Sequence, residues 1–412
     1  MTGYNEITKA FRLARRTLPP PSDKLDRAQA VAFRQLQTRT KGIKECSLHF
    51  GNLGLIAAAA ELTIRRESTQ ICFAFTVLKP TSAGKQHSMS PKKLPAYQVI
   101  DGLRVSTVFT EEMIRDALNF KTGPGDVVLA TFPKCGTHWL QQVVQLIMNK
   151  GQSANDWSEF WNGAPVLEMG WAKTLEKIPA PRVMQTHIPL HRLHYNPATK
   201  YVYLVRNPKD CCVSFFHHTR MLPEYQFQDG SFDDFFKLFL KGETDHGDYF
   251  DHVMSWYAHK DDPNVFFCTY EDLKKHTRDV VLKLAHFLGQ EYGKLLEENE
   301  DVLNQVLEKS SVQFMKDAFD SWNQKLERAF AKDSSVIPEG MKKFLLDDSG
   351  KFAASNLVRK GEVGNWKTLF SADHSRRLQE RINEKTKGSD VMSLWAVCGQ
   401  PRASENERQK AR

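Results

Sequence analysis

Short apolar runs, each followed by a polar turn and then by apolar residues at helical spacing, recur along the chain from Leu94 onward. The run 127–132 has no polar alternation, which is typical of a strand buried on both faces. After the turn 133–137, apolar residues recur on one face of an amphipathic helix, at Leu140, Val143, Val144, Ile147 and Met148. The pattern therefore predicts a strand, a tight turn and a helix in succession.

Three further runs, 182–186, 201–205 and 265–269, are predicted as buried strands in the same way, and helical spacing follows the last two. Alternating strands and helices predict a parallel central sheet flanked by helices on both faces, so the expected fold class is α/β. In such sheets ligands bind outside the carboxyl ends of the strands. The turn after the first predicted strand is therefore a candidate binding site.

The two ends of the chain differ from this central part. Residues 1–93 hold 16 basic and 6 acidic residues, together with three consecutive prolines and a run of four alanines. We expect a basic, weakly structured N-terminal extension over 1–93, a folded domain over 94–398 and a charged C-terminal tail over 399–412. A targeting helix for an organelle is an alternative to a plain basic tail, although Glu6 counts against it.

The overall charge of +8 does not indicate a nucleic-acid partner, because residues 94–412 carry 41 basic and 43 acidic residues. The longest nearly uncharged apolar stretch, 52–60, is too short to cross a bilayer, so we expect no membrane partner. Seven cysteines without a CxxC pair favour a reducing compartment, and we predict a cytoplasmic location.

The turn 133–137 contains the residue types that bind an anion at the start of a helix. Gly136 allows close backbone approach, while Lys134 and Thr137 supply charge and a hydroxyl donor. The turn is not a nucleoside-triphosphate loop, because that motif has a glycine directly before the lysine and another five residues upstream of the pair. Taken alone, the string is equally compatible with an ordinary surface turn.

Three strings together resolve this ambiguity. Residues 131–139, TFPKCGTHW, resemble the phosphosulfate-binding loop TYPKSGTTW of the cytosolic sulfotransferases. Residues 203–214, YLVRNPKDCCVS, and 358–367, VRKGEVGNWK, resemble two further signatures of that family, in the same order along the chain. The resemblance implies a P-loop-like nucleotide-binding architecture, with 3′-phosphoadenylyl sulfate (PAPS) as donor and 3′-phosphoadenosine 5′-phosphate (PAP) as product.

The resemblance also implies roles for individual residues. Arg206 and Ser214 would hold the 3′-phosphate, and Trp139 and Tyr270 would contact the adenine. The full set of expected cofactor-binding residues is Lys134, Cys135, Gly136, Thr137, His138, Trp139, Arg206, Ser214, Tyr270, Ser310, Val312, Met315, Val358, Arg359, Lys360 and Gly361.

His187 is the expected catalytic base. It lies in 181–190, PRVMQTHIPL, which resembles the family's RxxKTHLP segment, and an imidazole accepts a proton at neutral pH. Lys134 would neutralise the charge that develops on the leaving phosphate. The expected reaction moves the sulfuryl group to a hydroxyl, or an amine, of a small and largely apolar acceptor.

Several positions depart from the family pattern. Gln185 stands where lysine is common, although its amide can still donate a hydrogen bond, and Cys135 replaces a serine that would be the better donor. The family's dimer motif is degraded over 367–376, so a homodimer stays open. The expected acceptor-lining residues are Phe132, Val166, Leu167, Gln185, Tyr249 and Phe250.

Alternative functions remain at this stage. His187, His191 and His194 have a spacing that could suit a metal, but Pro189 interrupts it, and we expect no metal. A nucleoside or nucleotide kinase would use a similar loop with Mg²⁺. A third alternative is an inactive or weakly active nucleotide-binding protein of the same fold, which the substitution at Gln185 leaves open.

Overall fold

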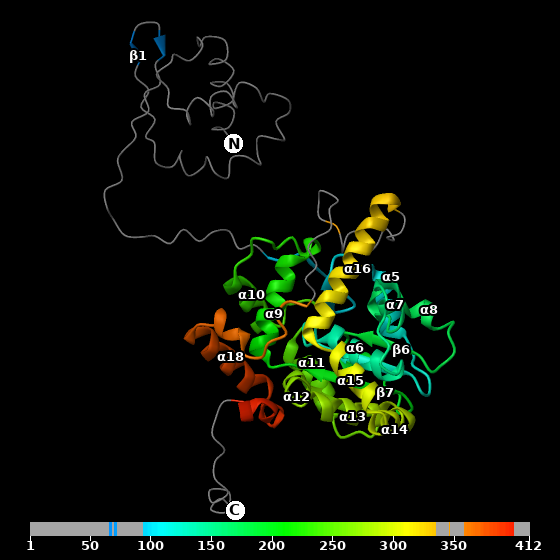
Figure 1. The fold of residues 1–412 in the computed structure, drawn as a ribbon. Coiled ribbons are helices and arrows are strands. Elements are labelled where there is room, and N and C mark those ends of the chain that lie inside the picture. The colour runs from blue at the N-terminus through cyan, green and yellow to red at the C-terminus, as the bar shows by residue number, and fades with distance from the viewer. Residues whose placement is uncertain (1–65, 68–69, 72–93, 335–345, 347–357, 399–412) are drawn as a thin grey trace, which may run out of the picture. The chain divides into compact units, whose positions relative to one another are not determined.

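The computed structural model describes residues 66–67, 70–71, 94–334, 346 and 358–398 (Figure 1). The chain divides into two compact units, residues 1–88 and 89–412. In the first unit only the antiparallel pair β1 (Arg66–Glu67) and β2 (Gln70–Ile71) is described. The predicted tail over 399–412 and almost all of the predicted extension lie outside the described residues, so these boundaries stay predictions.

The second unit is built on a parallel four-stranded sheet. Its strands are β5 (Val127–Thr131), β6 (Val183–Thr186), β7 (Lys200–Val205) and β8 (Val265–Thr269), in the spatial order β6-β5-β7-β8. Every neighbouring pair is parallel. The four apolar runs each form the predicted strand within one residue at either end, and the α/β fold class is confirmed.

Alternate residues of the same strands pack into two separate apolar cores. Val128 and Ala130 of β5 belong to one core, while Val127 and Leu129 belong to the other. This alternation explains the uninterrupted apolar runs, because both faces of each strand are covered.

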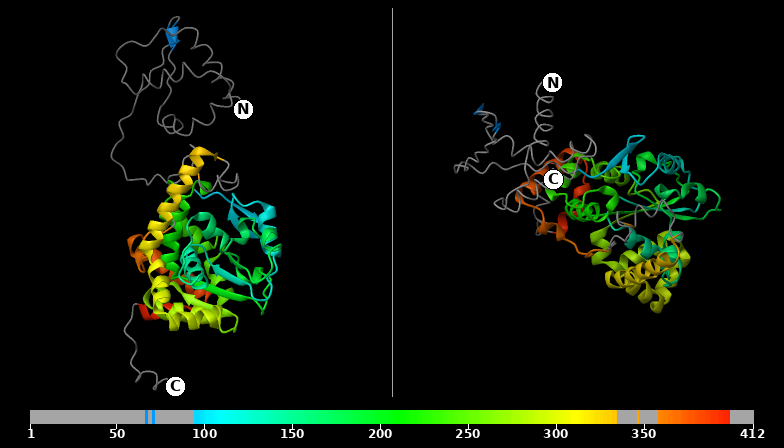
Figure 2. Two further views of the ribbon diagram at one scale, coloured as in Figure 1. Left: turned by 45° about the vertical axis from the view of Figure 1, so that its right-hand side comes forward. Right: turned by 90° about the horizontal axis from the view of Figure 1, so that it is seen from above.

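Helices cover both faces (Figure 2). The first core takes side chains from α5 (Glu111–Asn119), α9 (Pro208–Met221), α10 (Phe232–Lys241), α11 (Tyr249–Tyr257) and α18 (Ala372–Lys385). The second takes them from α6 (Thr137–Met148), α7 (Trp157–Asn162), α12 (Tyr270–Lys275), α13 (Thr277–Leu288), α14 (Gln290–Glu298), α15 (Glu300–Lys309) and α16 (Val312–Lys332).

Two helices begin next to strand ends, where they matter for the site. Helix α6 begins at Thr137, directly after Gly136, whose φ of 113° lies in the left-handed region, and no side chain caps its first turn. Helix α9 begins after Asn207, whose side chain accepts a hydrogen bond from the Lys209 N–H, and has Pro208 in its first turn. Both starts lie at the carboxyl ends of neighbouring strands, β5 and β7.

The hairpin of β3 (Tyr97–Ile100) and β4 (Leu103–Ser106) was not predicted from the apolar pattern. Its turn residues Asp101 and Gly102 both have positive φ, as the Asp-Gly pair of a tight hairpin favours. The remaining short elements are α8 (Ala172–Leu175), η1 (Leu167–Met169), η2 (Leu190–Arg192), η3 (Pro223–Tyr225), η5 (Asn365–Thr368) and η6 (Val391–Cys398). Among the described helices, none combines the length and the apolar character that a membrane span requires.

Candidate active site

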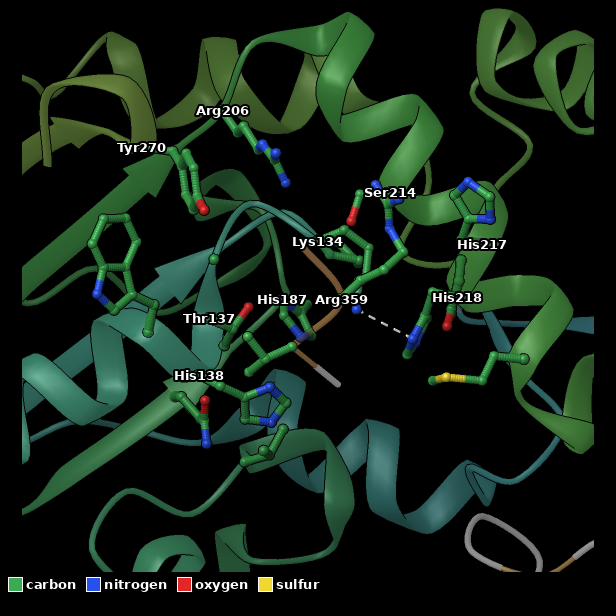
Figure 3. A pocket seen from close by; sticks show the side chains of 18 of the residues that line it. Lys134, Thr137, His138, His187, Arg206, Ser214, His217, His218, Tyr270 and Arg359 are labelled. Atoms are coloured by element: carbon green, nitrogen blue, oxygen red, sulfur yellow. Dashed lines mark hydrogen bonds between the residues drawn. The ribbon is translucent and has the colours of Figure 1, made fainter. Parts of the chain in front are cut away.

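A cavity of about 460 Å³ opens at the carboxyl ends of the parallel strands. Its walls come from the turn after β5, the start of α6, the end of β6, helix α9 and the segment 358–362 (Figure 3). The cavity lies where ligands bind in open parallel sheets. Segments far apart in the sequence therefore contribute to one site.

Most of the predicted site residues line this cavity, and six do not. Those that line it are Lys134, Gly136, Thr137, His138, Trp139, Val166, Gln185, His187, Arg206, Ser214, Tyr270, Val312, Met315, Val358, Arg359, Lys360 and Gly361. Those outside its lining are Phe132, Cys135, Leu167, Tyr249, Phe250 and Ser310, all of them buried.

Four of the six make contacts elsewhere, and Leu167 and Phe250 belong to the first core. Cys135 points into the first core, where its Sγ lies 3.8 Å from that of Cys211. Phe132 packs edge-on against Tyr249, whose hydroxyl donates to the carbonyl of Arg206 at 2.5 Å. The backbone oxygen of Ser310 accepts from the indole of Trp139. These residues are buried beneath the cavity lining, whereas we predicted that they contact the cofactor or the acceptor directly.

The turn after β5 is tightly constrained. A Cβ atom at Gly136 would lie 2.9 Å from Cδ2 of Tyr270, so this position requires glycine for space as well as for its φ. The hydroxyls of Thr137 and Thr131 are hydrogen-bonded at 2.7 Å. Because no side chain caps helix α6, its first N–H groups are free to bind an anion.

Lys134 lies at the centre of the cavity wall, with a φ of 69° that is unusual for a residue other than glycine. Burial, with a further contribution from Arg206, lowers the pKa of Lys134 to about 8. Its Nζ lies 3.3 Å from Nδ1 of His218, a residue that sequence reasoning missed (Figure 3).

Two arginines from distant segments face the cavity together. Arg206 lies over the ring of Tyr270 and donates to the carbonyl of Glu362 at 2.7 Å, but its buried Nε has no partner among the described residues. The Nε of Arg359 is likewise buried, and no residue that the structure describes is its partner. Burial, followed by Arg206, lowers the pKa of Arg359. Two like charges with unused donors around one cavity indicate an anion site.

Helix α9 holds the segment that carries Arg359. The carboxylate of Asp210 accepts hydrogen bonds from the backbone N–H groups of Gly364 and Trp366, at 2.7 and 2.9 Å. Lys209 stacks on the indole of Trp366. Asp210 was not predicted from the sequence, because nothing along the chain shows that a helix carboxylate meets a loop 154 residues later.

An aromatic and apolar wall closes the neighbouring part of the cavity. The rings of Trp139 and Tyr270 meet at 4.9 Å, and Val312 and Met315 lie beside them in the lining. A Cβ atom at Gly361 would lie 2.4 Å from Cγ2 of Val312, which explains glycine in this loop. The wall offers flat apolar surface of the kind that a nucleobase stacks on.

The imidazole of His187 is fixed in one tautomer. Its Nδ1 lies 2.8 Å from the carbonyl oxygen of Thr131, which can only accept, so Nδ1 carries the proton and Nε2 is left with its lone pair. Its backbone N–H donates to Oε1 of Glu168 at 2.5 Å. Burial, followed by His246, lowers the pKa of His187 to about 3. The ring is thus neutral at pH 7, and the lone pair of Nε2 is unprotonated.

The amide of Gln185 is hydrogen-bonded within the protein. Its Nε2 donates to Oε1 of Gln141 at 3.1 Å and to the carbonyl of Ala164 at 2.7 Å. The Ala164 carbonyl can only accept, so the amide orientation is fixed and both amide hydrogens are used within the protein. The amide thus donates hydrogen bonds, as expected, but to Gln141 and Ala164, and the remaining Oε1 has no partner among the described residues.

Sequence reasoning also missed Glu168, His217 and Asp245, which line the cavity together with His246. Glu168 directly follows two predicted acceptor-lining positions, Val166 and Leu167, so its place in the sequence could have indicated that it lies near the acceptor. Within the described part of the chain, no group of three or more His, Cys, Asp or Glu side chains could hold a metal ion.

A family model, curated relatives and solved structures all match this chain to the same family. The family model described as the sulfotransferase domain matches residues 124–390. Sulfotransferase 6B1 of Mus musculus is 32% identical over 302 residues, covering 71% of this chain and 87% of that protein. Sulfotransferase 1C2 of Oryctolagus cuniculus is 31% identical over 288 residues, covering 66% and 87%. The crystal structure of mouse sulfotransferase SULT7A1 complexed with PAP superposes with a TM-score of 0.55 at 26% identity, covering 74% of this chain and 99% of that one.

Proposed function

The chain belongs to the sulfotransferase family, and from this premise we propose that it binds PAPS in the cavity and transfers the sulfuryl group to an acceptor hydroxyl. One observation carries the proposal. Lys134, Arg206 and Arg359 converge with the open start of α6 on a cavity that also contains the free Nε2 of His187. The match to a relative that was solved with PAP supports it.

The residues present suit a nucleotide with phosphates at two positions. The unpaired Nε atoms of Arg206 and Arg359, with the hydroxyl of Ser214 nearby in the lining, would hold the 3′-phosphate. The turn 134–137 and the first N–H groups of α6 would hold the 5′-phosphate. Trp139 and Tyr270 would contact the adenine.

The transfer step follows from the two groups at the reacting end. The acceptor oxygen forms its bond to sulfur as the bond from sulfur to the bridging phosphate oxygen breaks. The hydroxyl proton passes to Nε2 of His187, and the electron pair of the broken bond stays on the phosphate. The ammonium of Lys134 would neutralise this developing charge.

The family assignment decides against the kinase alternative. An activity measurement distinguishes the proposed enzyme from an inactive nucleotide-binding protein of the same fold, and the test below makes that measurement. The acceptor is a small molecule, as for the matched relatives. The predicted cytoplasmic location remains a proposal, and a homodimer stays open.

The test measures transfer of labelled sulfate from PAPS to a panel of hydroxylated compounds, with wild type and His187→Ala. We expect transfer by the wild type, and a fall in turnover of about 10² to 10⁴ in the variant. PAP affinity should be retained, because His187 is assigned to the acceptor proton and not to the phosphates. Wild-type-like turnover in His187→Ala would remove the assignment, and no transfer to any compound despite PAP binding would favour the inactive alternative.

A further inference from the structure

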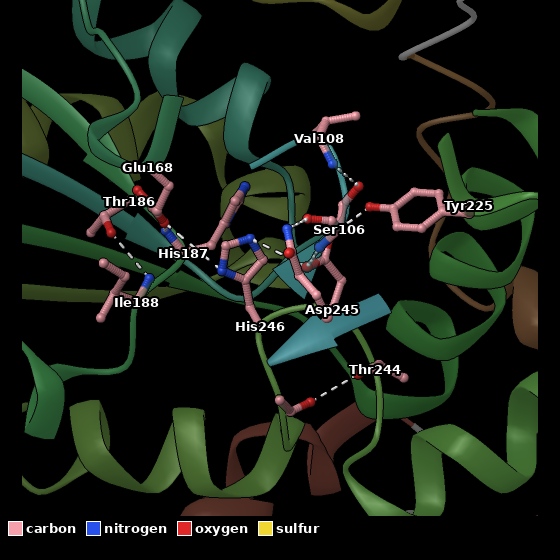
Figure 4. A network of polar contacts seen from close by, with 12 residues as sticks. Ser106, Val108, Glu168, Thr186, His187, Ile188, Tyr225, Thr244, Asp245 and His246 are labelled. Atoms are coloured by element: carbon pink, nitrogen blue, oxygen red, sulfur yellow. Dashed lines mark hydrogen bonds and ion pairs between the residues drawn. The ribbon is translucent and has the colours of Figure 1, made fainter. Parts of the chain in front are cut away.

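One wall of the cavity, next to His187, is acidic. It consists of Glu168, Asp245 and His246, which we call the acidic wall (Figure 4). The ring of His246 lies between the two carboxylates, with Nδ1 3.9 Å from Oε1 of Glu168 and Nε2 3.8 Å from Oδ1 of Asp245. Its centroid is 5.1 Å from that of His187. The acidic wall is therefore adjacent to the expected base.

Neither carboxylate of the acidic wall has a strong cationic partner. Glu168 is fully buried and Asp245 is 4% exposed, yet no Lys or Arg side chain forms an ion pair with either within the described part of the chain. Asp245 accepts hydrogen bonds from neutral donors, the N–H of Ser106 at 3.0 Å and the hydroxyl of Tyr225 at 2.6 Å. Burial raises the pKa of Glu168 to about 7 and that of Asp245 to about 6. A buried carboxylate without a cation is costly, so a cationic ligand would be stabilised here.

Polar atoms of this region also lack partners. Oε2 of Glu168 and Nδ1 of His246 are buried and make no hydrogen bond among the described residues. Oε1 of Gln185, the remaining acceptor on a third lining residue, is also unpaired. Because buried polar groups in proteins are rarely left unpaired, these atoms point to a ligand that donates hydrogen bonds.

We propose that the acceptor carries a protonated amine, which binds at the acidic wall while its hydroxyl faces Nε2 of His187. This inference rests on the proposed sulfuryl transfer and specifies its substrate class. The ammonium would offset the two carboxylates and donate to the unpaired atoms. It keeps its proton, and the hydroxyl alone reacts.

The experiment uses acceptors of matched shape that differ in charge. Three phenols carry ammonium, hydroxyl or methyl at the end of the same chain: 4-(2-aminoethyl)phenol, 4-(2-hydroxyethyl)phenol and 4-propylphenol. A second pair, 3-(aminomethyl)phenol and 3-ethylphenol, places the charge closer to the reacting oxygen. Affinity is measured by calorimetry on the full chain loaded with PAP, at about pH 7.5, where both carboxyls are largely ionised. Turnover with PAPS is measured in parallel.

We expect the ammonium compound of at least one set to bind about tenfold or more tightly than its neutral counterparts. The ratio of the ammonium compound's affinity to that of its neutral counterpart should fall about fivefold in Asp245→Asn and in Glu168→Gln. A general loss of binding lowers both affinities and leaves this ratio unchanged. Glu224→Gln is the matched control. It removes another buried carboxyl near Asp245 that does not line the cavity, and it should leave the ratio unchanged.

The outcomes separate the two proposals. Equal affinity for charged and neutral members, binding of no member, or an equal fall of the ratio in Glu224→Gln would overturn the amine inference. Tight binding of the hydroxyethyl compound alone would also overturn it, in favour of a neutral donor. A clear preference for ammonium without any sulfuryl transfer would instead overturn the proposed function and leave the binding inference standing.

Discussion

The surroundings of Lys134 disfavour the protonated form of its side chain. Burial and the nearby Arg206 lower its pKa to about 8, well below the usual 10.5. The protonated form binds a phosphate better, so PAP affinity should fall as the pH rises above about 8, by up to tenfold per pH unit. The PAP affinity stops falling once the pH exceeds the pKa of Lys134 in the PAP complex. That pKa is higher than in the free protein, because the bound anion stabilises the ammonium. Titration of PAP between pH 7 and 10 measures this.

Lys134→Arg is the matched control for that profile. A guanidinium stays charged throughout this range, so its PAP affinity should lack the decline above pH 8, whatever its absolute value. A decline of equal size in both proteins would show that another group is responsible. Within the lining, His218 accepts from Lys134 through Nδ1, and burial lowers the pKa of His218, so that ring stays neutral over the same range.

At the residue scale, the sequence could identify most of the cavity lining but not the direction of every side chain. The signature strings place Lys134 and Thr137 in the cavity, yet Cys135 between them points into the first core. Its direction depends on the tight turn and on Cys211 of helix α9, which sequence spacing does not show. The use of both Gln185 hydrogens inside the protein depends in the same way on Gln141 and Ala164.

At the scale of elements, the central strands β5 and β7 were predictable because each is covered on both faces, which leaves a nearly continuous apolar run. The hairpin β3–β4 was missed because polar residues, Gln98 and Arg104, interrupt its two strands, so neither strand gives an apolar run. Its position matters, since Ser106 at the end of β4 donates to Asp245 of the acidic wall. Such a contact between segments 139 residues apart needs the folded structure.

The link between α9 and the segment 358–367 leads to a prediction about Asp210. Asp210→Ala removes both acceptors for the Gly364 and Trp366 N–H groups, so the segment should lose its fixed position. Charged hydrogen bonds contribute about 1.5–3 kcal/mol each, and we expect PAP affinity to fall by about 10- to 100-fold. Calorimetry with PAP measures the loss.

A double substitution tests whether Asp210 acts through Arg359. If it does, Asp210→Ala should cost much less affinity in an Arg359→Ala background than in the wild type. Thr110→Ala is the control: it removes a similar bond from a side chain to a helix N–H, in α5, outside the cavity lining. Additive losses, or PAP affinity in Asp210→Ala equal to that of the wild type, would contradict the link.

At the scale of the whole molecule, the parts needed for binding lie within one unit. The two apolar cores, the cavity and the family match all fall within residues 100–395 of the unit 89–412. The basic excess of the chain, in contrast, belongs to residues 1–93. The basic excess and the two apolar cores thus belong to different parts of the sequence.

A chain that begins at Met89 should therefore fold and bind PAP without the first unit. We expect one cooperative thermal transition, and a PAP affinity within about twofold of the full chain at 0.15 M salt, where exposed charges are largely screened. PAP at 100 times its dissociation constant should stabilise both proteins by about 2.7 kcal/mol, because ligand binding favours the folded state. A larger stabilisation of the full chain at equal PAP concentration, or aggregation of the shorter one, would show that residues 1–88 contribute to the nucleotide site or to the fold.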